Sequence, residues 1–276
     1  MEDPQKIREA GSAGKLYPAD ALTLEREISL LLESAPPVDV PNAIKAIIVP
    51  HDGYMYSGGV AARAYRQIMD QNIKRVVVIA PSHYDSFSFI SIFGGNAYRT
   101  PLGDLPVDKE IASDLQDFHE EIQFSFTGHS PAENSLEVQL PFLQYIFGKI
   151  KIVPIALGLQ SQTQIDILSE ALSMALPPQE SLIIASTDLS HHHPDAEARS
   201  LDQIARMDIE NYNEDKLWDD IASHRTEMCG YGAAISAMKT ARSFGAKTTR
   251  VLIYRNSGDI TGDRNKVVGY LSAVIY

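Results

Sequence analysis

The sequence predicts an α/β protein: a single three-layer α/β/α domain with a mostly parallel central sheet over residues 1–276. Short runs of β-branched apolar residues alternate along the chain with stretches whose apolar residues recur at helical spacing. The short runs are apolar throughout, as in strands that are buried on both faces of a parallel sheet. No repeat, low-complexity tract or long linker divides the chain, so we expect one domain.

Each element follows from its local pattern. Strands are expected at residues 44–49, 75–80, 151–157, 181–186, 250–254 and 267–276. Helices are expected at residues 21–33, 59–70, 108–118, 135–147, 163–175, 195–212 and 231–244. Glycine and aspartate are dense between residues 256 and 264, which predicts a turn-rich loop. The last two strands are therefore expected to form an antiparallel pair.

Composition and charge exclude several classes of protein. Hydrophobic residues make up 44% of the chain and charged residues 22%, which is typical of a globular protein. The net charge of −12 argues against partners such as nucleic acids or anionic membrane surfaces. No apolar run is long enough to span a membrane, and the first residues lack a signal-peptide pattern. We expect a cytoplasmic protein, and its single cysteine cannot form an intramolecular disulfide.

Histidines follow three of the expected strands. His51 and His83 come after the first two strands, and His191 comes after a later one. The carboxyl ends of parallel strands meet at one edge of a sheet, so these side chains are expected to converge. A lone loop histidine is usually solvated, but three at corresponding strand ends favour a functional site. The sequence therefore predicts a metal site at this edge.

Two neighbours of these histidines are open to more than one interpretation. Only one histidine of the run His191-His192-His193 is expected to act at the site. Asp188 is expected to orient an imidazole, to join the ligands or to cap a turn. Cys229 precedes an expected helix, where it is either a metal-binding or nucleophilic thiolate or a small buried hydrophobe.

The segment before the expected helix at residues 135–147 combines structural and functional candidates. Asn134 and Glu137 have the spacing of a capping pair, which favours a structural role for Glu137. His129 and Glu133 lie in the approach loop and are expected to bind substrate. Pro141 is expected to kink the helix.

Motifs across nearly the whole chain carry a family resemblance. They are Gly14-Lys-Leu-Tyr-Pro18, Pro50-His-Asp-Gly-Tyr-Met-Tyr-Ser-Gly58, Pro81-Ser-His83, Thr100-Pro-Leu-Gly103, Glu133-Asn-Ser-Leu-Glu-Val-Gln-Leu-Pro-Phe-Leu-Gln144, Ser186-Thr-Asp-Leu-Ser-His191, Cys229-Gly230, Asn256-Ser-Gly-Asp259 and Val267-Val-Gly-Tyr270. With these motifs the sequence resembles the Memo family, which in microbes is protein B of the AmmeMemoRadiSam system. The family's fold is similar to that of class III extradiol dioxygenases, which hold non-haem iron with two histidines and a carboxylate. In Memo proteins a cysteine replaces that carboxylate.

The resemblance implies a ligand set that coincides with the residues singled out above. His51, His83 and Cys229 would hold one transition-metal ion, with Fe(II) favoured over Cu or Zn. His191 stands where the dioxygenases keep an acid/base histidine, and Asp188 lies beside it. Both are therefore expected to be catalytic.

Three further positions complete the expected site. Tyr54, in the motif that contains His51, is assigned to substrate binding together with Glu133 and His129. Two residues depart from the family pattern: Asp52 stands where alanine is usual, and Asn134 stands where histidine is usual. An asparagine amide can donate a hydrogen bond but cannot carry a proton. The side chain at that position therefore does not act as an acid or base.

The expected site residues are compatible with three functions. The first is a non-haem metal-binding redox enzyme, similar to a dioxygenase or oxidase, with a substrate that the sequence does not identify. The second is a non-catalytic adaptor that binds metal or a peptide, and the third is a metal-free hydrolase with Cys229 as nucleophile and His51 as base. Expected partners are a small-molecule or peptide ligand and the AMMECR-type and radical SAM proteins of the same system.

Overall fold

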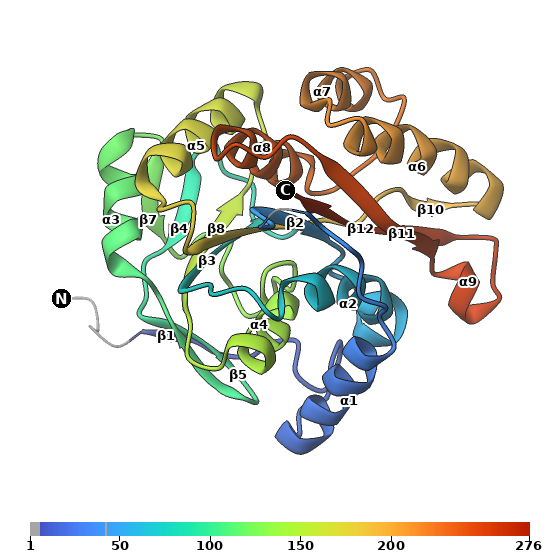
Figure 1. The fold of residues 1–276 in the computed structure, drawn as a ribbon, viewed down its shortest axis with the longest axis horizontal. Coiled ribbons are helices and arrows are strands. Elements are labelled where there is room, and N and C mark those ends of the chain that lie inside the picture. The colour runs from blue at the N-terminus through green and yellow to red at the C-terminus, as the bar shows by residue number, and fades with distance from the viewer. Residues whose placement is uncertain (1–5, 42) are drawn as a thin grey trace.

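The computed structural model describes residues 6–41 and 43–276 and is built around one large sheet. The strand order is β10-β12-β2-β9-β3-β8-β4-β7, and β11 also pairs with β12 (Figure 1). The strands are β2 (Ala46–Val49), β3 (Arg75–Pro81), β4 (Ile90–Phe93), β7 (Ile122–Ser125), β8 (Lys151–Leu157), β9 (Ser181–Ser186), β10 (His191–His193), β11 (Thr249–Asn256) and β12 (Val267–Ile275).

The centre of the sheet is parallel and its flanks are antiparallel. The strands β2, β9, β3 and β8 run parallel to their neighbours in that order. β12 runs antiparallel to β2 and to β11, and β4 runs antiparallel to β8. Every residue of β2 and β9 is buried, because helices cover both faces of the sheet. The predicted parallel centre and the predicted antiparallel closing pair are both confirmed.

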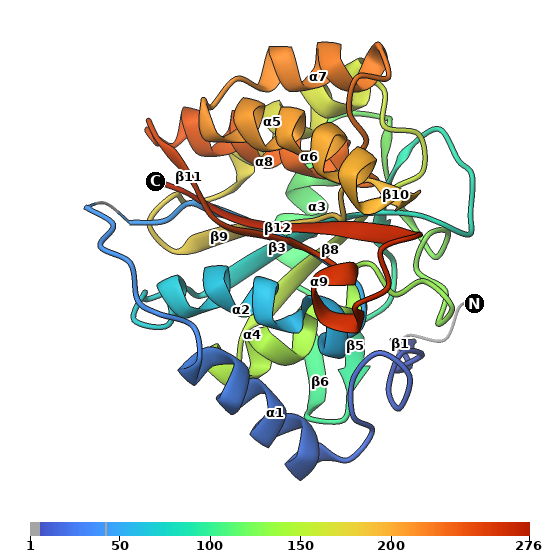
Figure 2. The same ribbon diagram turned by 90° about the vertical axis from the view of Figure 1, so that its right-hand side faces the viewer.

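Helices cover both faces of this sheet, which confirms the three-layer α/β/α prediction. They are α1 (Ala21–Glu33), α2 (Gly59–Tyr65), α3 (Lys109–Phe118), α4 (Leu140–Phe147), α5 (Gln162–Ala175), α6 (Asp195–Glu210), α7 (Glu214–Ala222), α8 (Tyr231–Ser243) and α9 (Gly258–Thr261). Figure 2 shows α5, α6, α7 and α8 on one side of the sheet and α1, α2 and α4 on the other. α8 packs against β9 and β2, and α2 packs against β12 and β2. Within the described ranges, no helix is both long and apolar enough to cross a bilayer.

Several short elements were not expected from the sequence. A separate small sheet has the order β1-β5-β6, formed by β1 (Ile7–Arg8), β5 (Ala97–Thr100) and β6 (Gly103–Pro106). The strands β4, β7 and β10 and the helix α7 were also missed. These strands have two to four residues each, so they carry too few residues to show a period.

The segment at residues 135–147 corrects two expectations. It forms a 3-10 turn at Glu137–Gln139 followed by α4, and neither start has a side-chain cap. The predicted capping pair is wrong, because the Asn134 amide donates instead to the carbonyl oxygen of His51 (3.1 Å). Pro141 lies in the first turn of α4, where a missing N–H costs no helical hydrogen bond. It therefore starts the helix and does not kink it.

Glu137 has a structural function that differs from the predicted one. Its carboxylate accepts hydrogen bonds from the Arg8 guanidinium, the backbone N–H groups of Gly11 (3.0 Å) and Ser12 (2.8 Å), and the Tyr17 hydroxyl (2.5 Å). We call these five residues the Glu137 clamp. Arg8 is 4% exposed and Glu137 is fully buried. The clamp therefore fastens the N-terminal segment to the loop that precedes α4.

Candidate metal centre

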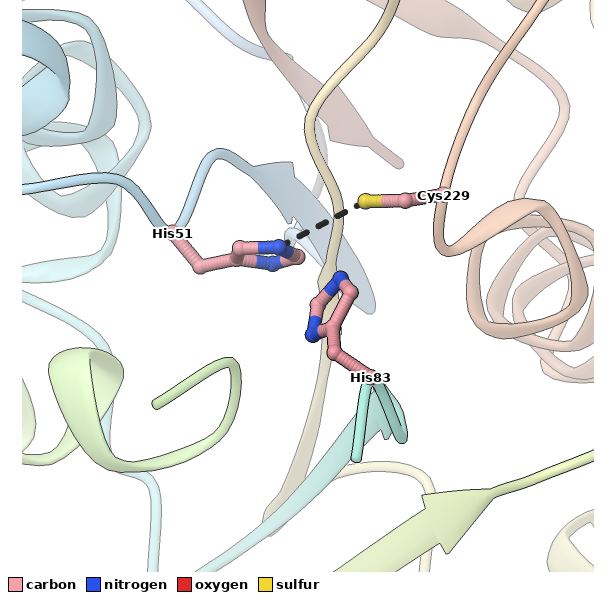
Figure 3. Close-up of side chains that lie close together, drawn as sticks. All are labelled: His51, His83 and Cys229. Carbon is pink, nitrogen blue, oxygen red and sulfur yellow. Dashed lines mark hydrogen bonds between the residues drawn. The ribbon is translucent and has the colours of Figure 1, made fainter. Parts of the chain in front are cut away.

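Three side chains converge at the carboxyl edge of the parallel strands. His51 follows β2, His83 follows β3, and Cys229 precedes α8. The strands β2 and β3 flank β9 in the sheet, so their carboxyl ends open at the same edge. Figure 3 shows the two imidazoles and the thiol directed toward one another. One donor atom from each residue lies within 4.8 Å of the other two. The predicted convergence of these residues is present in the structure.

The spacing and chemistry of these donors fit a transition-metal ion. The Cys229 sulfur lies 3.4 Å from Nε2 of His51. A tetrahedral ion with ligand bonds of about 2.1 Å to nitrogen and 2.3 Å to sulfur separates those two ligands by about 3.6 Å. Imidazole and thiolate together suit iron, copper and zinc. A search of the described residues for three or more potential metal ligands within reach of one ion finds His51, His83 and Cys229.

A hydrogen-bond network behind His51 determines its tautomer. Nδ1 of His51 lies 3.1 Å from the Ser186 hydroxyl oxygen. That hydroxyl donates its proton to the carbonyl oxygen of Ser135 (2.5 Å) and accepts from the Gln139 amide (2.8 Å). Because its one proton is already donated, Ser186 must accept the bond from Nδ1–H of His51. The lone pair of Nε2 is therefore directed toward Cys229 and is available to a metal.

A buried carboxylate holds His83 in the same way. The Glu133 carboxylate accepts hydrogen bonds from Nδ1 (3.0 Å) and the backbone N–H (2.5 Å) of His83 and from the Ser135 N–H (3.1 Å). The bond to Glu133 raises the pKa of His83. Burial favours a higher pKa for Glu133, but the bonds from His83 outweigh it and lower this pKa to about 2. Glu133, which the sequence assigns to substrate binding, therefore stands behind the candidate ligand His83 and orients it.

Backbone contacts position Cys229. Its N–H donates to the carbonyl oxygen of Asp188 (3.2 Å), and the Asp188 N–H donates to the Cys229 sulfur (3.2 Å). The Gln160 amide donates to the Cys229 carbonyl oxygen (2.7 Å). A Cβ atom at Gly230 would lie 2.4 Å from the carbonyl oxygen of Ser186, so only glycine allows this approach. The cysteine is thus held against the end of β9.

Burial determines the electrostatics of the cluster. Desolvation and the neighbouring His83 lower the pKa of His51 to about 3, so its imidazole is neutral at neutral pH. Burial and the nearby Asp188 carboxylate raise the pKa of the Cys229 thiol. Burial also raises the pKa of Asp188, against the effect of the His51 backbone N–H that bonds its carboxylate (2.9 Å).

A cavity of about 320 Å³ opens onto the two histidines. Asp188, His191, Asn134 and Asp52 line it together with Tyr84. The Asp52 carboxylate, a departure from the family pattern, accepts a hydrogen bond from the Tyr270 hydroxyl (2.5 Å). Asp188 and His191, the two expected catalytic residues, therefore share one cavity with His51 and His83.

His191 is the histidine of its run that reaches this cavity. His192 is exposed and has a positive φ of 64°. His193 forms ion pairs on the surface with Glu197 (3.2 Å) and Glu227 (3.0 Å). Of the three histidines, His191 thus lies at the cavity, and its catalytic function stays a prediction.

The structure does not bring two of the expected substrate-binding residues to the cavity. His129 is buried, its Nδ1 bonded to the Tyr98 hydroxyl (2.6 Å) and its Nε2 close to the carbonyl oxygen of Ser91 (3.2 Å). The hydroxyl of Tyr54 donates to the carbonyl oxygen of Val138 (2.8 Å). Their polar atoms are already used by internal partners, so both residues act as part of the core.

Sequence reasoning missed several residues around the candidate ligands. Ser186 and Gln139 hold His51, and Tyr84 and Tyr270 lie at or next to the cavity. A signal existed for Ser186, because it ends an apolar strand at the same edge as the histidines. The loop and helix positions show no comparable pattern.

Comparisons with known proteins identify the family. A family model described as Memo-like protein matches residues 8–274. A MEMO1 family protein of Methanobrevibacter smithii is 36% identical over 280 residues, covering 97% of this chain and 99% of that protein. One from Methanothermobacter thermautotrophicus is 35% identical over 278 residues, covering 96% and 98%. The crystal structure of an uncharacterized Escherichia coli K12 protein has the same fold, with a TM-score of 0.56 at 13% identity over 85% of this chain and 100% of that one. The chain therefore belongs to the Memo family.

Proposed function

We propose that this protein binds one transition-metal ion through His51, His83 and Cys229 and uses it in a redox reaction on a small molecule. The observation that carries this proposal is the convergence of three donor atoms within 4.8 Å at a cavity. Two imidazoles and one thiolate leave open coordination positions on an ion. Fe(II) is the favoured metal, and Cu and Zn are the alternatives.

Each residue around the proposed centre has its own function. When bound, the ion supplies Lewis-acid or electron-transfer chemistry to a molecule in the cavity. Ser186 and Glu133 keep the Nε2 lone pairs of the two histidines directed at the ion. Asp188 fixes the backbone of His51 through its carboxylate. His191, which lines the cavity, exchanges a proton with the bound molecule.

Metal analysis of protein purified without oxygen tests the binding step. Metal-free protein is titrated with Fe(II), Cu(I) or Zn(II), and bound metal is counted per chain. We expect one ion in the wild type and little in His51→Ala or Cys229→Ser. The exposed imidazole of His192 provides the matched control, so His192→Ala should bind like the wild type. Equal binding by all four proteins would contradict the proposal.

Oxygen uptake tests the catalytic step. His191→Gln should keep its metal, while turnover of a reactive small molecule falls by roughly 10²- to 10⁴-fold, the usual share of general acid/base catalysis. His192→Gln should be unaffected. Loss of metal in His191→Gln would make this residue a ligand, and metal binding without any turnover in the wild type would favour the adaptor function.

One observation supports a second candidate, the metal-free hydrolase. The 3.4 Å contact between the Cys229 sulfur and Nε2 of His51 has the arrangement of a nucleophile and its base. Burial opposes this function, because it raises the pKa of the Cys229 thiol and lowers the pKa of His51. Both the thiolate and the imidazolium that the reaction needs are therefore disfavoured. Hydrolysis of a test ester that persists in a chelator and is lost in Cys229→Ser would favour it.

A further inference from the structure

We infer that the molecule on which the centre acts carries an uncharged, ring-sized apolar group, which binds in a second cavity beside Cys229. This inference rests on the proposed function and names the class of its substrate. The second cavity has a volume of about 430 Å³, within the range of small-molecule sites. We call it the Trp218 cavity after the residue in its wall. Its apolar wall consists of Trp218, Ile221, Met228 and Tyr231.

The Trp218 cavity adjoins the candidate metal centre through two shared residues. His191 lines both this cavity and the one that opens onto His51 and His83. Cys229 is a candidate ligand and also part of the wall of the Trp218 cavity. A single molecule can therefore place a polar end at the centre and an apolar body against Trp218.

The wall is suited to a ring. The side chains of Trp218 and Tyr231 lie with their ring centroids 6.0 Å apart and their planes tilted by 60°. Met228 is 4% exposed and closes the wall with a polarisable thioether. Aromatic and thioether groups bind flat apolar groups through dispersion and edge contacts.

The charges around both cavities disfavour an anion. Among the described residues, no lysine or arginine lines either cavity. Beside the histidines that line both, Asp52 and Asp188 line the first cavity and Glu227 lines the second. Glu227 is paired with His193 (3.0 Å), so it offers no free charge for a cation. A ligand whose apolar part carries no charge therefore enters the Trp218 cavity with the smallest desolvation cost.

The wall is formed before any ligand binds. Asp220 of α7 is fully buried, accepts a hydrogen bond from Lys216 (2.5 Å) and pairs with Arg225 in the following loop. The backbone N–H of Arg225 also donates to the carbonyl oxygen of Asp220 (2.9 Å). These contacts fix the helix that carries Trp218 and Ile221, so binding requires little ordering of the wall.

Fluorescence provides a direct test, because Trp218 is the only tryptophan of the chain. Metal-free full-length protein is titrated with benzyl alcohol, which has an uncharged ring, and with benzoate, its anionic counterpart. We expect a saturable change in Trp218 emission with benzyl alcohol and an apparent Kd at least about 10-fold higher with benzoate. Calorimetric titration of the same pair excludes optical artefacts.

Two matched variants show where the probe binds. Ile221→Gln places a polar group in the wall and should raise the Kd of benzyl alcohol by about 10-fold. Leu22→Gln makes the same kind of change on α1, where Leu22 is 65% exposed, and should leave the Kd unchanged. No saturable change, equal affinity for benzoate, or equal effects of the two variants would overturn the inference. Because this readout requires no metal, a failed metal titration with intact probe binding would refute the proposed function alone.

Discussion

Two buried polar clusters lie close together in this protein, and they differ in how their polar atoms are used. In the Glu137 clamp, one carboxylate accepts from four donors of the N-terminal segment. At the candidate metal centre, the donor atoms of His51, His83 and Cys229 face one another, and the Nδ1 atoms of the two histidines are bonded to Ser186 and Glu133. A buried carboxylate whose oxygens are taken up by internal donors stabilises the fold, whereas lone pairs directed at a common point indicate a ligand.

The loop at residues 130–137 connects the two clusters. Arg8 of the clamp also donates to the carbonyl oxygen of Glu133 (2.5 Å). The Glu133 side chain holds His83, and Asn134 holds the carbonyl oxygen of His51. The clamp side chains bond one another, whereas the donor atoms of the centre face a common point. Although the loop joins the two clusters, changes in the clamp should affect mainly stability, and changes at the centre should affect mainly metal affinity.

Breaking the clamp should have the largest effect. Glu137→Leu leaves the Arg8 guanidinium buried without its anion, which should lower the free energy of unfolding by about 3–5 kcal/mol. Urea denaturation of metal-free protein measures this change. The exposed pair of Arg99 and Asp104 is the control, and Asp104→Asn should cost about 1 kcal/mol or less. Equal losses of free energy of unfolding in the two variants would show that the clamp stabilises the fold no more than a surface ion pair does.

A substitution at the candidate centre should lower metal affinity strongly and the free energy of unfolding only slightly. His51→Ala removes one of the three proposed ligands and should weaken metal binding by more than about 100-fold, beyond the usual effect of losing a supporting residue. The free energy of unfolding without metal should fall by no more than about 2 kcal/mol. Competition with a chelator measures the affinity. A variant that keeps its affinity but loses its stability would place His51 with the structural residues.

His129 extends the comparison to pH, because it is buried and internally bonded like the clamp. Burial lowers its pKa to about 3, below its ordinary value of 6.5. The unfolded chain therefore binds the proton first, and stability should be lost as the pH falls from about 6.5 toward 3. At pH 5 the loss from this residue should be about 2 kcal/mol. Urea denaturation at pH 7 and pH 5 should show a smaller difference for His129→Gln than for the wild type, and an unchanged difference would contradict this.

Glu133 should behave as a member of the centre. Glu133→Gln keeps the shape of the side chain but weakens the hydrogen bond that orients His83. Metal affinity should fall by about 10- to 100-fold, the usual cost of losing a residue behind a ligand. Chelator competition measures the change, with Glu197→Gln on the surface as control. An unchanged affinity would mean that His83 needs no support.

Asn134 should show the smallest effect. Asn134→Ala loses the bond to the His51 carbonyl oxygen, which should cost about 1 kcal/mol of stability. Metal affinity should stay within a few-fold of the wild type, because no ligand atom is released. A loss of affinity as large as that of His51→Ala would show that Asn134 is part of the coordination sphere.

The sequence predicts elements with a regular apolar pattern and site residues that directly follow a predicted strand. The apolar runs that become β2, β3 and β9 could be recognised, and with them the convergence of His51 and His83. The clamp could not, because Arg8 and Glu137 are 129 positions apart and no local pattern links them. For the same reason the sequence assigns His129 to the site, since spacing does not show that the Tyr98 hydroxyl is bonded to its ring nitrogen.

X-ray absorption at the metal edge of the Zn(II)-loaded protein tests the central claim most directly. If His51, His83 and Cys229 hold the ion, the spectrum should show one sulfur at about 2.3 Å and nitrogen ligands at about 2.0–2.1 Å, and Cys229→Ser should lack the sulfur. A coordination shell of nitrogen and oxygen alone in the wild type would contradict the claim.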